Sequence, residues 1–96
     1  MKRLEKFVKE RNWEKYHTPK NLAISIAIES AELMEHFQWN DISFEGIKKD
    51  NRKKREVEDE IADVMIYCLL FIKYMNCDIE KILVRKIGEN EKKYEI

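Results

Sequence analysis

The segment Leu22-Ala-Ile-Ser-Ile-Ala-Ile-Glu29-Ser-Ala-Glu32-Leu-Met34 places two carboxylates inside a run that is otherwise nearly all apolar. A second segment, Glu60-Ile-Ala-Asp63-Val-Met-Ile-Tyr-Cys-Leu-Leu-Phe-Ile72, has the same character. Residues three apart share a helix face, so each pair presents two carboxylates in one direction. Apolar residues wrap most of the circumference of the first segment, which is typical of a buried helix. The two segments therefore predict buried helices that carry acidic pairs.

These acids need a partner if they are buried together. Burying one ionised carboxylate alone is costly, and four in one place would also repel one another. Mg²⁺ takes carboxylate oxygens as ligands and keeps coordination positions for substrate phosphates. We therefore predict that Glu29, Glu32, Glu60 and Asp63 bind Mg²⁺, with Mn²⁺ as the alternative, for a metal-dependent phosphate chemistry.

Acidic residues at this spacing also allow other interpretations. Glu56-x-x-Asp59 matches the same pattern, but it lies in a charged stretch and predicts ordinary solvated side chains. Structural ion pairs are a further alternative for the four acids. A ferritin-like di-iron site would need Glu-x-x-His motifs on helices. The only such spacing, Glu14 to His17, precedes Pro19 and lies outside the predicted helices.

The remaining segments predict further helices and no strands. Forty per cent charged residues, with two Gly and one Pro, suit a helical protein. Thr18 is a suitable cap and Pro19 a suitable first residue for a helix, and Asp78 can cap the last one. The predicted helices span residues 2–11, 19–37, 52–75 and 79–94, and the link 40–50 has room for one short turn. We expect one all-α domain over residues 1–96.

A chain of this length has more apolar helix faces than it can enclose alone. We therefore expect a four-helix-type bundle that is completed by dimerisation, with a dimer of dimers as a further possibility. The zero formal net charge argues against a nucleic-acid partner that would need a broad basic surface. The apolar run 64–72 is too short to span a bilayer.

The same composition predicts a cytoplasmic protein. Cys68 and Cys77 would lie about 13 Å apart along one continued helix, too far for a disulfide, so two free thiols are expected. The charged start of the chain has none of the apolar core of a signal peptide.

Around the four acids the chain resembles the MazG-like nucleoside triphosphate pyrophosphohydrolases, whose mark is E-x-x-E followed by E-x-x-D. Residues 11–22, 32–39 and 63–67 resemble blocks of the dCTP pyrophosphatase branch. The segment Lys86-Ile-Gly-Glu-Asn90-Glu-Lys-Lys93-Tyr94 resembles its K-x-x-x-N-x-x-K-Y ending. The chain departs from the branch at Ala31, where Gly is usual, and at Leu4, where the branch has a substrate-contacting His.

The resemblance implies hydrolysis between the α- and β-phosphates, which gives a nucleoside monophosphate and pyrophosphate. dCTP-like pyrimidine nucleotides are the leading substrate class, and house-cleaning of nucleotide pools is the implied role. Glu29 or Glu32 would orient or deprotonate the attacking water. The alternative from another class is a non-catalytic helical dimer that acts as a partner-binding module.

The family also implies which residues contact the nucleotide. Aromatic side chains stack on bases, and the resemblance places Trp13 and Trp39 near the base and His17 beside the substrate. Tyr67 would contact the sugar and disfavour a 2′-hydroxyl. On the last predicted helix, three polar residues would bind phosphate oxygens: Lys86, Asn90 and Lys93.

Overall fold

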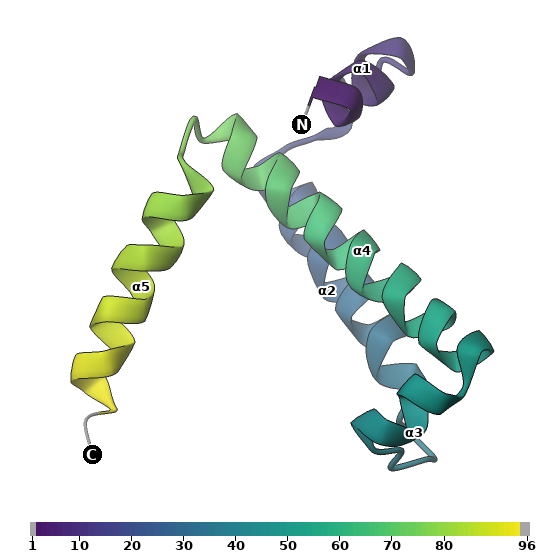
Figure 1. Cartoon of the computed structure of the whole chain (residues 1–96). Coiled ribbons are helices and arrows are strands. Elements are labelled where there is room, and N and C mark those ends of the chain that lie inside the picture. Colours follow the sequence, from purple (N-terminus) through teal and green to yellow (C-terminus); the bar gives the residue numbers. More distant parts are fainter. Residues whose placement is uncertain (1, 95–96) are drawn as a thin grey trace.

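The computed structural model describes residues 2–94, and every regular element in that range is helical (Figure 1). The elements are α1 (Lys2–Glu10), the 3₁₀ turn η1 (Glu14–Tyr16), α2 (Pro19–Glu35), α3 (Phe44–Lys49), α4 (Asn51–Tyr74) and α5 (Ile79–Lys93). The all-α prediction is confirmed, and the helix ends agree with the sequence to within two residues.

Side-chain caps explain where four of the helices begin. Thr18 Oγ1 accepts a hydrogen bond from the Asn21 backbone N–H at 3.1 Å, and Pro19 follows as the first residue of α2. Asp78 accepts from two backbone N–H groups at the start of α5, as expected. Ser43 and Asp50 cap α3 and α4 in the same way. Each cap satisfies a donor that the first turn would otherwise leave unpaired.

α1 and α4 end on asparagines with a left-handed backbone. Asn12 and Asn76 have φ angles of 55° and 56°, a region that asparagine tolerates better than most residues. Beyond α4, the Asn76 N–H donates to the Lys73 carbonyl and the Cys77 N–H to the Ile72 carbonyl. This is the Schellman pattern, and it turns the chain sharply before α5.

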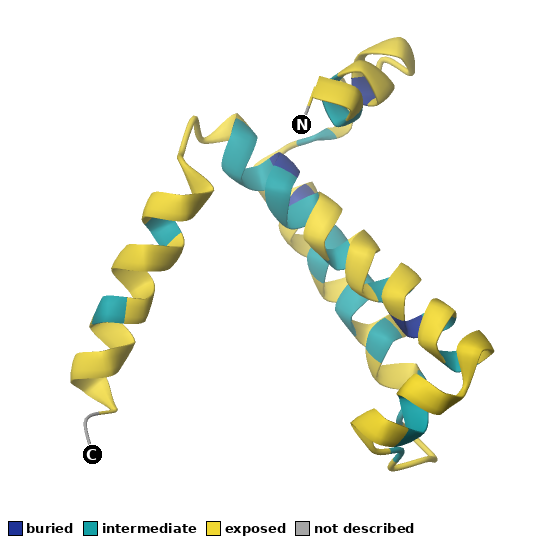
Figure 2. Ribbon diagram, viewed as in Figure 1, coloured by how far each residue is buried: buried dark blue, intermediate teal, exposed yellow. Residues whose placement is uncertain are grey.

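α2 and α4 form an antiparallel pair, and the small core lies at one end of it (Figures 1 and 2). Leu22 of α2 and Leu70 of α4 are each 2% exposed, and Val8 of α1 packs with them. Leu4, Tyr67 and Phe71 pack around this cluster. α3 packs against α4 at the other end of the pair. The core thus fixes α1 against the end of the pair where the 3₁₀ turn leads into α2.

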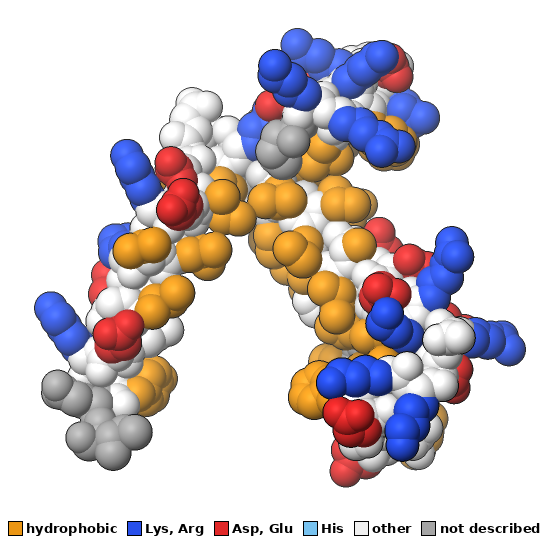
Figure 3. Space-filling model, viewed as in Figure 1, with side chains coloured by type: hydrophobic (Ala, Val, Ile, Leu, Met, Phe, Trp, Pro, Cys, Tyr) orange, Lys and Arg blue, Asp and Glu red, His pale blue; other side chains and the backbone are white. Residues whose placement is uncertain are grey.

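α5 stands away from the α2–α4 pair, so one chain does not form a closed four-helix bundle (Figure 1). Leu83, Val84 and Ile87 of α5 are 54%, 64% and 56% exposed. Apolar side chains of α5 and of the helix pair line the open space between them (Figure 3). The expectation that α2 is buried is wrong within one chain, because Ile28 and Met34 are more than half exposed.

Other sequence expectations concern the cysteines and the membrane. Cys68 and Cys77 are both free, as predicted, with Cys68 half-buried and Cys77 exposed. Among residues 2–94, every helix is too short or too polar to cross a membrane.

Candidate functional site

The acidic residues of α2 and α4 meet across the helix pair. Glu29 projects from α2, and Glu60 and Asp63 project from one face of α4. One carboxylate oxygen from each of the three lies within 4.8 Å of the others. The antiparallel direction of the helices brings the two acidic segments together, although Glu29 and Glu60 are 31 positions apart in the sequence. We call these three residues the acidic cluster.

Glu32, the fourth predicted ligand, does not belong to this closest group but lies beside it. Its negative charge contributes to raising the pKa of both Glu29 and Glu60. It is exposed, whereas Glu29 and Glu60 are half-buried. Glu32 therefore remains near enough to serve as an outer ligand or to act on a water.

The acidic cluster is electrostatically unsatisfied. Oε2 of Glu29 and Oε2 of Glu60 are shielded from solvent and have no hydrogen-bond partner. Desolvation raises the pKa of Glu29, and Glu32, Asp63 and Glu60 raise it further. Desolvation also raises the pKa of Glu60, with Glu32 and Asp63 adding to the effect and His36 opposing it. Unpaired oxygens and mutual repulsion fit a hard divalent cation, so this is a possible metal-binding cluster.

A cavity of about 380 Å³ opens where the 3₁₀ turn meets α2 and α4. It contains three residues predicted to contact the nucleotide, namely Trp13, His17 and Tyr67. The sequence argument missed four other residues that line it: Tyr16, Asn21, Leu22 and Ser25. Asn21 is held in place because its side-chain amide donates to the Tyr16 carbonyl at 3.0 Å. The cavity thus combines aromatic faces with polar groups.

The cavity and the acidic cluster are neighbours along the α2–α4 pair, and we call the two together the groove. On α2, Ser25 of the cavity lies one turn before Glu29, and on α4, Tyr67 lies one turn after Asp63. One turn advances about 6 Å along a helix. A ligand with an aromatic end in the cavity would therefore direct its other end toward the carboxylates.

His17 is fixed at the edge of the cavity by Tyr74. The Nδ1 atom of His17 lies 2.9 Å from the Tyr74 hydroxyl, and the two rings meet edge to face. Desolvation lowers the pKa of His17, against the opposing charge of Glu14. Desolvation also raises the pKa of Tyr74. Both side chains are therefore neutral around pH 7, and the hydrogen bond holds the imidazole in one orientation.

Four predicted binding residues lie away from this groove in the single chain. Trp39 follows the end of α2 and is 89% exposed. The others lie on α5, which is separated from the acidic cluster (Figure 1): Lys86, Asn90 and Lys93, all of them exposed. Within one chain, the fold brings together the predicted metal ligands and part of the predicted base pocket, but not these four.

The sequence did not predict the side chains that surround Glu60. His36 Nε2 lies 3.9 Å from Glu60 Oε1, and Lys53 Nζ lies 3.2 Å from His36 Nδ1. The position of His36, one turn after Glu32 on the same helix, was the feature of the sequence that could have indicated this contact. Asp59 is exposed and the Glu56 side chain is 42% exposed, in keeping with the prediction of solvated charges at both positions. The Glu56 carboxylate pairs with Arg52, four residues earlier on α4, at 3.2 Å, and its Oε2 atom lies 3.9 Å from His36 Nδ1.

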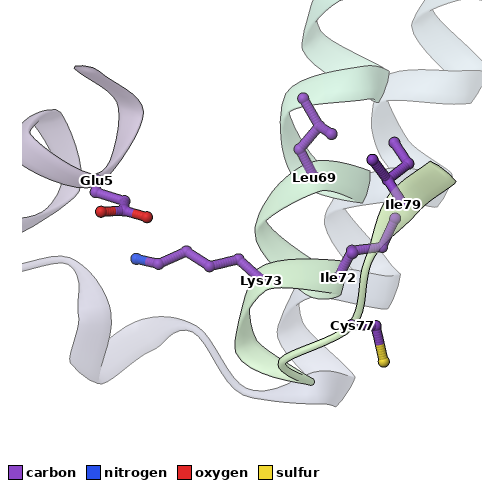
Figure 4. A pocket seen from close by; sticks show the side chains of 6 residues that line it. All are labelled: Glu5, Leu69, Ile72, Lys73, Cys77 and Ile79. Carbon is purple, nitrogen blue, oxygen red and sulfur yellow. The ribbon is translucent and has the colours of Figure 1, made fainter. Parts of the chain in front are cut away.

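A separate hollow of about 260 Å³ lies between α1, the end of α4 and the start of α5 (Figure 4). Leu69, Ile72 and Ile79 form its apolar wall, and Cys77 adds a thiol at its edge. Glu5 and Lys73 are its charged members. None of the residues implicated by the sequence lines this hollow.

The chain is similar to known proteins over most of its length. Residues 24–96 match the model of the MazG-like family. A pyrophosphatase from Archaeoglobus fulgidus DSM 4304, known from its crystal structure, is 48% identical. The match covers 97% of this chain and 86% of that one, with a TM-score of 0.85. The fold of the pyrophosphatase is therefore also the fold of this chain.

Curated proteins are also similar in sequence to this chain. dCTP pyrophosphatase 1 from Rattus norvegicus is 31% identical over 91 residues, which is 94% of this chain. The Homo sapiens protein of that name is 30% identical over 89 residues. The chain spans about half the length of these relatives, 54% and 52% respectively. The family match, the relatives and the solved structure agree, and the chain belongs to the MazG-like family.

Proposed function

We propose that this protein is a nucleoside triphosphate pyrophosphohydrolase that converts (deoxy)nucleoside triphosphates, with dCTP-like nucleotides foremost, to the monophosphate and pyrophosphate. The observation that carries the proposal is the acidic cluster one helical turn from an aromatic-lined cavity. This arrangement suits a ligand with a base at one end and phosphates at the other. The names of the similar proteins, pyrophosphatase and dCTP pyrophosphatase 1, point to the same chemistry. House-cleaning of nucleotide pools is the role we attach to it.

The residues of the cluster fit Mg²⁺, with Mn²⁺ as the alternative, because all their donor atoms are carboxylate oxygens. Glu29, Glu60 and Asp63 would hold the metal, and Glu32 lies close enough to complete the set. A bound divalent cation neutralises phosphate charge and favours ionisation of the attacking water. Glu29 or Glu32 would orient that water and accept its proton.

The cavity would take the base and sugar. Trp13 offers an aromatic face, and its ring is supported by an edge contact with Phe7 at 5.3 Å between centroids. Tyr67 lies between the cavity and Asp63, where the sugar of a nucleotide would sit, and its ring would disfavour a 2′-hydroxyl by crowding. His17, held by Tyr74, would present its free nitrogen to the nucleotide.

We further propose that a second copy completes the site. Trp39 and the polar residues of α5 cannot serve the groove of their own chain from where they lie. The apolar face of α5 and the apolar side of the helix pair are both uncovered (Figure 3). A homodimer, or a dimer of dimers, would cover them and supply Trp39, Lys86, Asn90 and Lys93 to the partner's substrate.

Product analysis tests the activity. Purified protein with Mg²⁺ and a panel of deoxynucleoside triphosphates should give the monophosphate and pyrophosphate in one step, and early samples should contain no diphosphate. Accumulating diphosphate with orthophosphate would instead mean attack on the terminal phosphorus and would overturn the proposal. A non-catalytic partner-binding module would bind neither Mg²⁺ nor a non-hydrolysable nucleotide in a calorimetric titration.

Matched variants assign the activity to the cluster. Glu29→Ala and Asp63→Ala should abolish most hydrolysis while helicity is retained. Asp59→Ala, on the exposed side of α4, is the control and should behave as the unchanged protein. Near-normal turnover of Glu29→Ala at ordinary Mg²⁺ would show that the metal site is assigned wrongly.

A further inference from the structure

Lys53 and His36 make a pair of contacts beside the acidic cluster that the proposed reaction does not yet use. Lys53 Nζ lies 3.2 Å from His36 Nδ1 and 3.2 Å from the His36 carbonyl oxygen. Lys53 and Glu60 are seven residues apart on α4, which places them two turns apart on one face. The imidazole of His36, at the end of α2, lies between them.

A hydrogen bond from Lys53 selects one tautomer of the His36 ring. A lysine ammonium group has three donors and no acceptor, so Nδ1 of His36 must accept its hydrogen bond. In a neutral imidazole the proton then resides on Nε2. Nε2 is the nitrogen that faces Glu60 Oε1, at 3.9 Å. The lysine thus turns the donor side of the ring toward the acidic cluster.

The neighbouring Glu56 does not compete for this nitrogen. Its Oε2 atom is 3.9 Å from His36 Nδ1, farther than the 3.2 Å of Lys53. Its other oxygen, Oε1, accepts from Arg52 Nε at 3.2 Å. Lys53 is also anchored by the His36 carbonyl, one of the carbonyls that the end of a helix leaves without a helical partner. The side chain and backbone of His36 are therefore held by one ammonium group.

We propose that Lys53 and His36 are positioning residues that orient the carboxylate of Glu60 for metal binding. Nε2–H of His36 addresses Oε1 of Glu60, and Oε2, which is buried without a hydrogen-bond partner, is left for the cation. Closing the 3.9 Å separation by about 1 Å gives an ordinary hydrogen bond. Such contacts between a ligand and its neighbour set the direction and the basicity of the ligand. The inference rests on the proposed metal site.

Nitrogen NMR of the His36 ring tests, without substrate or metal, whether Lys53 selects the tautomer of His36. The unchanged protein should carry hydrogen on Nε2 of His36 and none on Nδ1. Lys53→Met should lose this preference, whereas Lys54→Met, at the exposed neighbouring position, should keep it. A ring protonated on Nδ1 in the unchanged protein, or the same tautomer in Lys53→Met, would overturn the proposal.

Calorimetric titration with Mg²⁺ alone tests whether His36 prepares Glu60 for metal binding. His36→Leu should weaken Mg²⁺ binding roughly 10–100-fold, the usual effect of losing such a neighbour. His36→Gln, which keeps an N–H close to the position of Nε2, should restore most of the affinity. Circular dichroism checks that both variants fold, and Lys53→Met provides a third variant if His36→Leu does not.

The outcomes separate this inference from the proposed function. If the unchanged protein hydrolyses nucleotides and binds Mg²⁺ but His36→Leu and Lys53→Met bind it equally well, the positioning role falls and the function stands. If the unchanged protein binds no Mg²⁺, the metal site fails and this inference fails with it. Weaker Mg²⁺ binding in both variants, with recovery in His36→Gln, supports the role.

Discussion

Individual carboxylates in this protein are placed where they are poorly satisfied. Glu29 and Glu60 each keep one oxygen that is shielded from solvent and has no hydrogen-bond partner. The negative charges of neighbouring acids repel these two carboxylates and raise their pKa values. Such an arrangement disfavours the charged form of these groups, and the proposed cation would relieve it.

The pH dependence of stability follows from these shifts. The folded pKa of Glu29 and of Glu60 lies above the ordinary value of 4.5, so the folded chain binds protons more readily than the unfolded chain. Their contribution to stability is fully present below about pH 4.5 and is lost as the pH rises through the raised values. Denaturant unfolding of metal-free protein along this range should show the loss. Glu60→Gln should reduce it, and Mg²⁺ should restore stability at neutral pH.

The control for the pH profile is a carboxylate next to Glu60 that lies on the surface. Asp59→Asn removes an exposed carboxylate one residue away and should leave the pH profile unchanged. A Glu60→Gln protein with the profile of the unchanged protein would show that Glu60 titrates normally in the folded chain.

Trp13 is expected to serve recognition more than folding. It lines the cavity and is 43% exposed, so its removal leaves no large void in the core. Loss of a base–aromatic stack costs about 1–3 kcal/mol, which corresponds to roughly a tenfold to hundredfold loss of nucleotide affinity. Trp13→Ala should show that loss with a small change in melting temperature. A large drop in melting temperature with little change in affinity would identify Trp13 as a packing residue.

At the scale of the elements, short polar signals decide where helices start and stop. Thr18, Asp50 and Asp78 cap their helices through side-chain oxygens, and asparagines end α1 and α4. The turn after α4 determines the direction in which α5 leaves the helix pair.

Asn76 is the residue on which that turn depends. Asn76→Gly should keep or slightly raise stability, because glycine adopts a positive φ without steric cost. Asn76→Val should destabilise the protein by about 1–2 kcal/mol, the usual cost of a left-handed backbone for a residue with a Cβ. Urea unfolding of the two variants checks this, and equal stability would mean that the turn has another backbone in solution.

At the scale of the whole molecule, the apolar surface exceeds what one chain covers. Leu83 and Ile87 lie one turn apart on α5, more than half exposed, and the facing side of the helix pair is equally open (Figure 3). Analytical ultracentrifugation should find a dimer or tetramer. The double variant Leu83→Lys with Ile87→Lys should shift it toward monomer and lower activity. A monomer that is fully active would contradict the shared site.

Subunit mixing shows whether Trp39 acts across the interface. Trp39→Ala and Glu60→Ala proteins should each have low activity, and mixed dimers should recover part of it, because one site then holds both intact residues. Failure to recover activity, with subunit exchange demonstrated by labelled protein, would place each complete pocket within one chain.

The sequence alone determined the main helices, the caps at Thr18 and Asp78, and the identity of the acidic residues. These features depend on local spacing. A separation of three residues gives Glu29 and Glu32 a shared helix face, and a side-chain oxygen stands ahead of the helices that begin after Thr18 and Asp78. The MazG-like family was also visible in the motifs. The contact of Glu60 with His36 was not predicted, because His36 comes from the end of α2, which is distant in sequence.

Only the tertiary structure decided which of these residues meet. The antiparallel pairing of α2 and α4 brings Glu29 to Glu60 and Asp63 and sets His36 between Lys53 and Glu60. The turn at Asn76 leaves Lys86 on a separate helix. Such placements depend on the packing of apolar faces between distant segments and on the direction of each turn. The spacing of residues along the chain predicts neither of these.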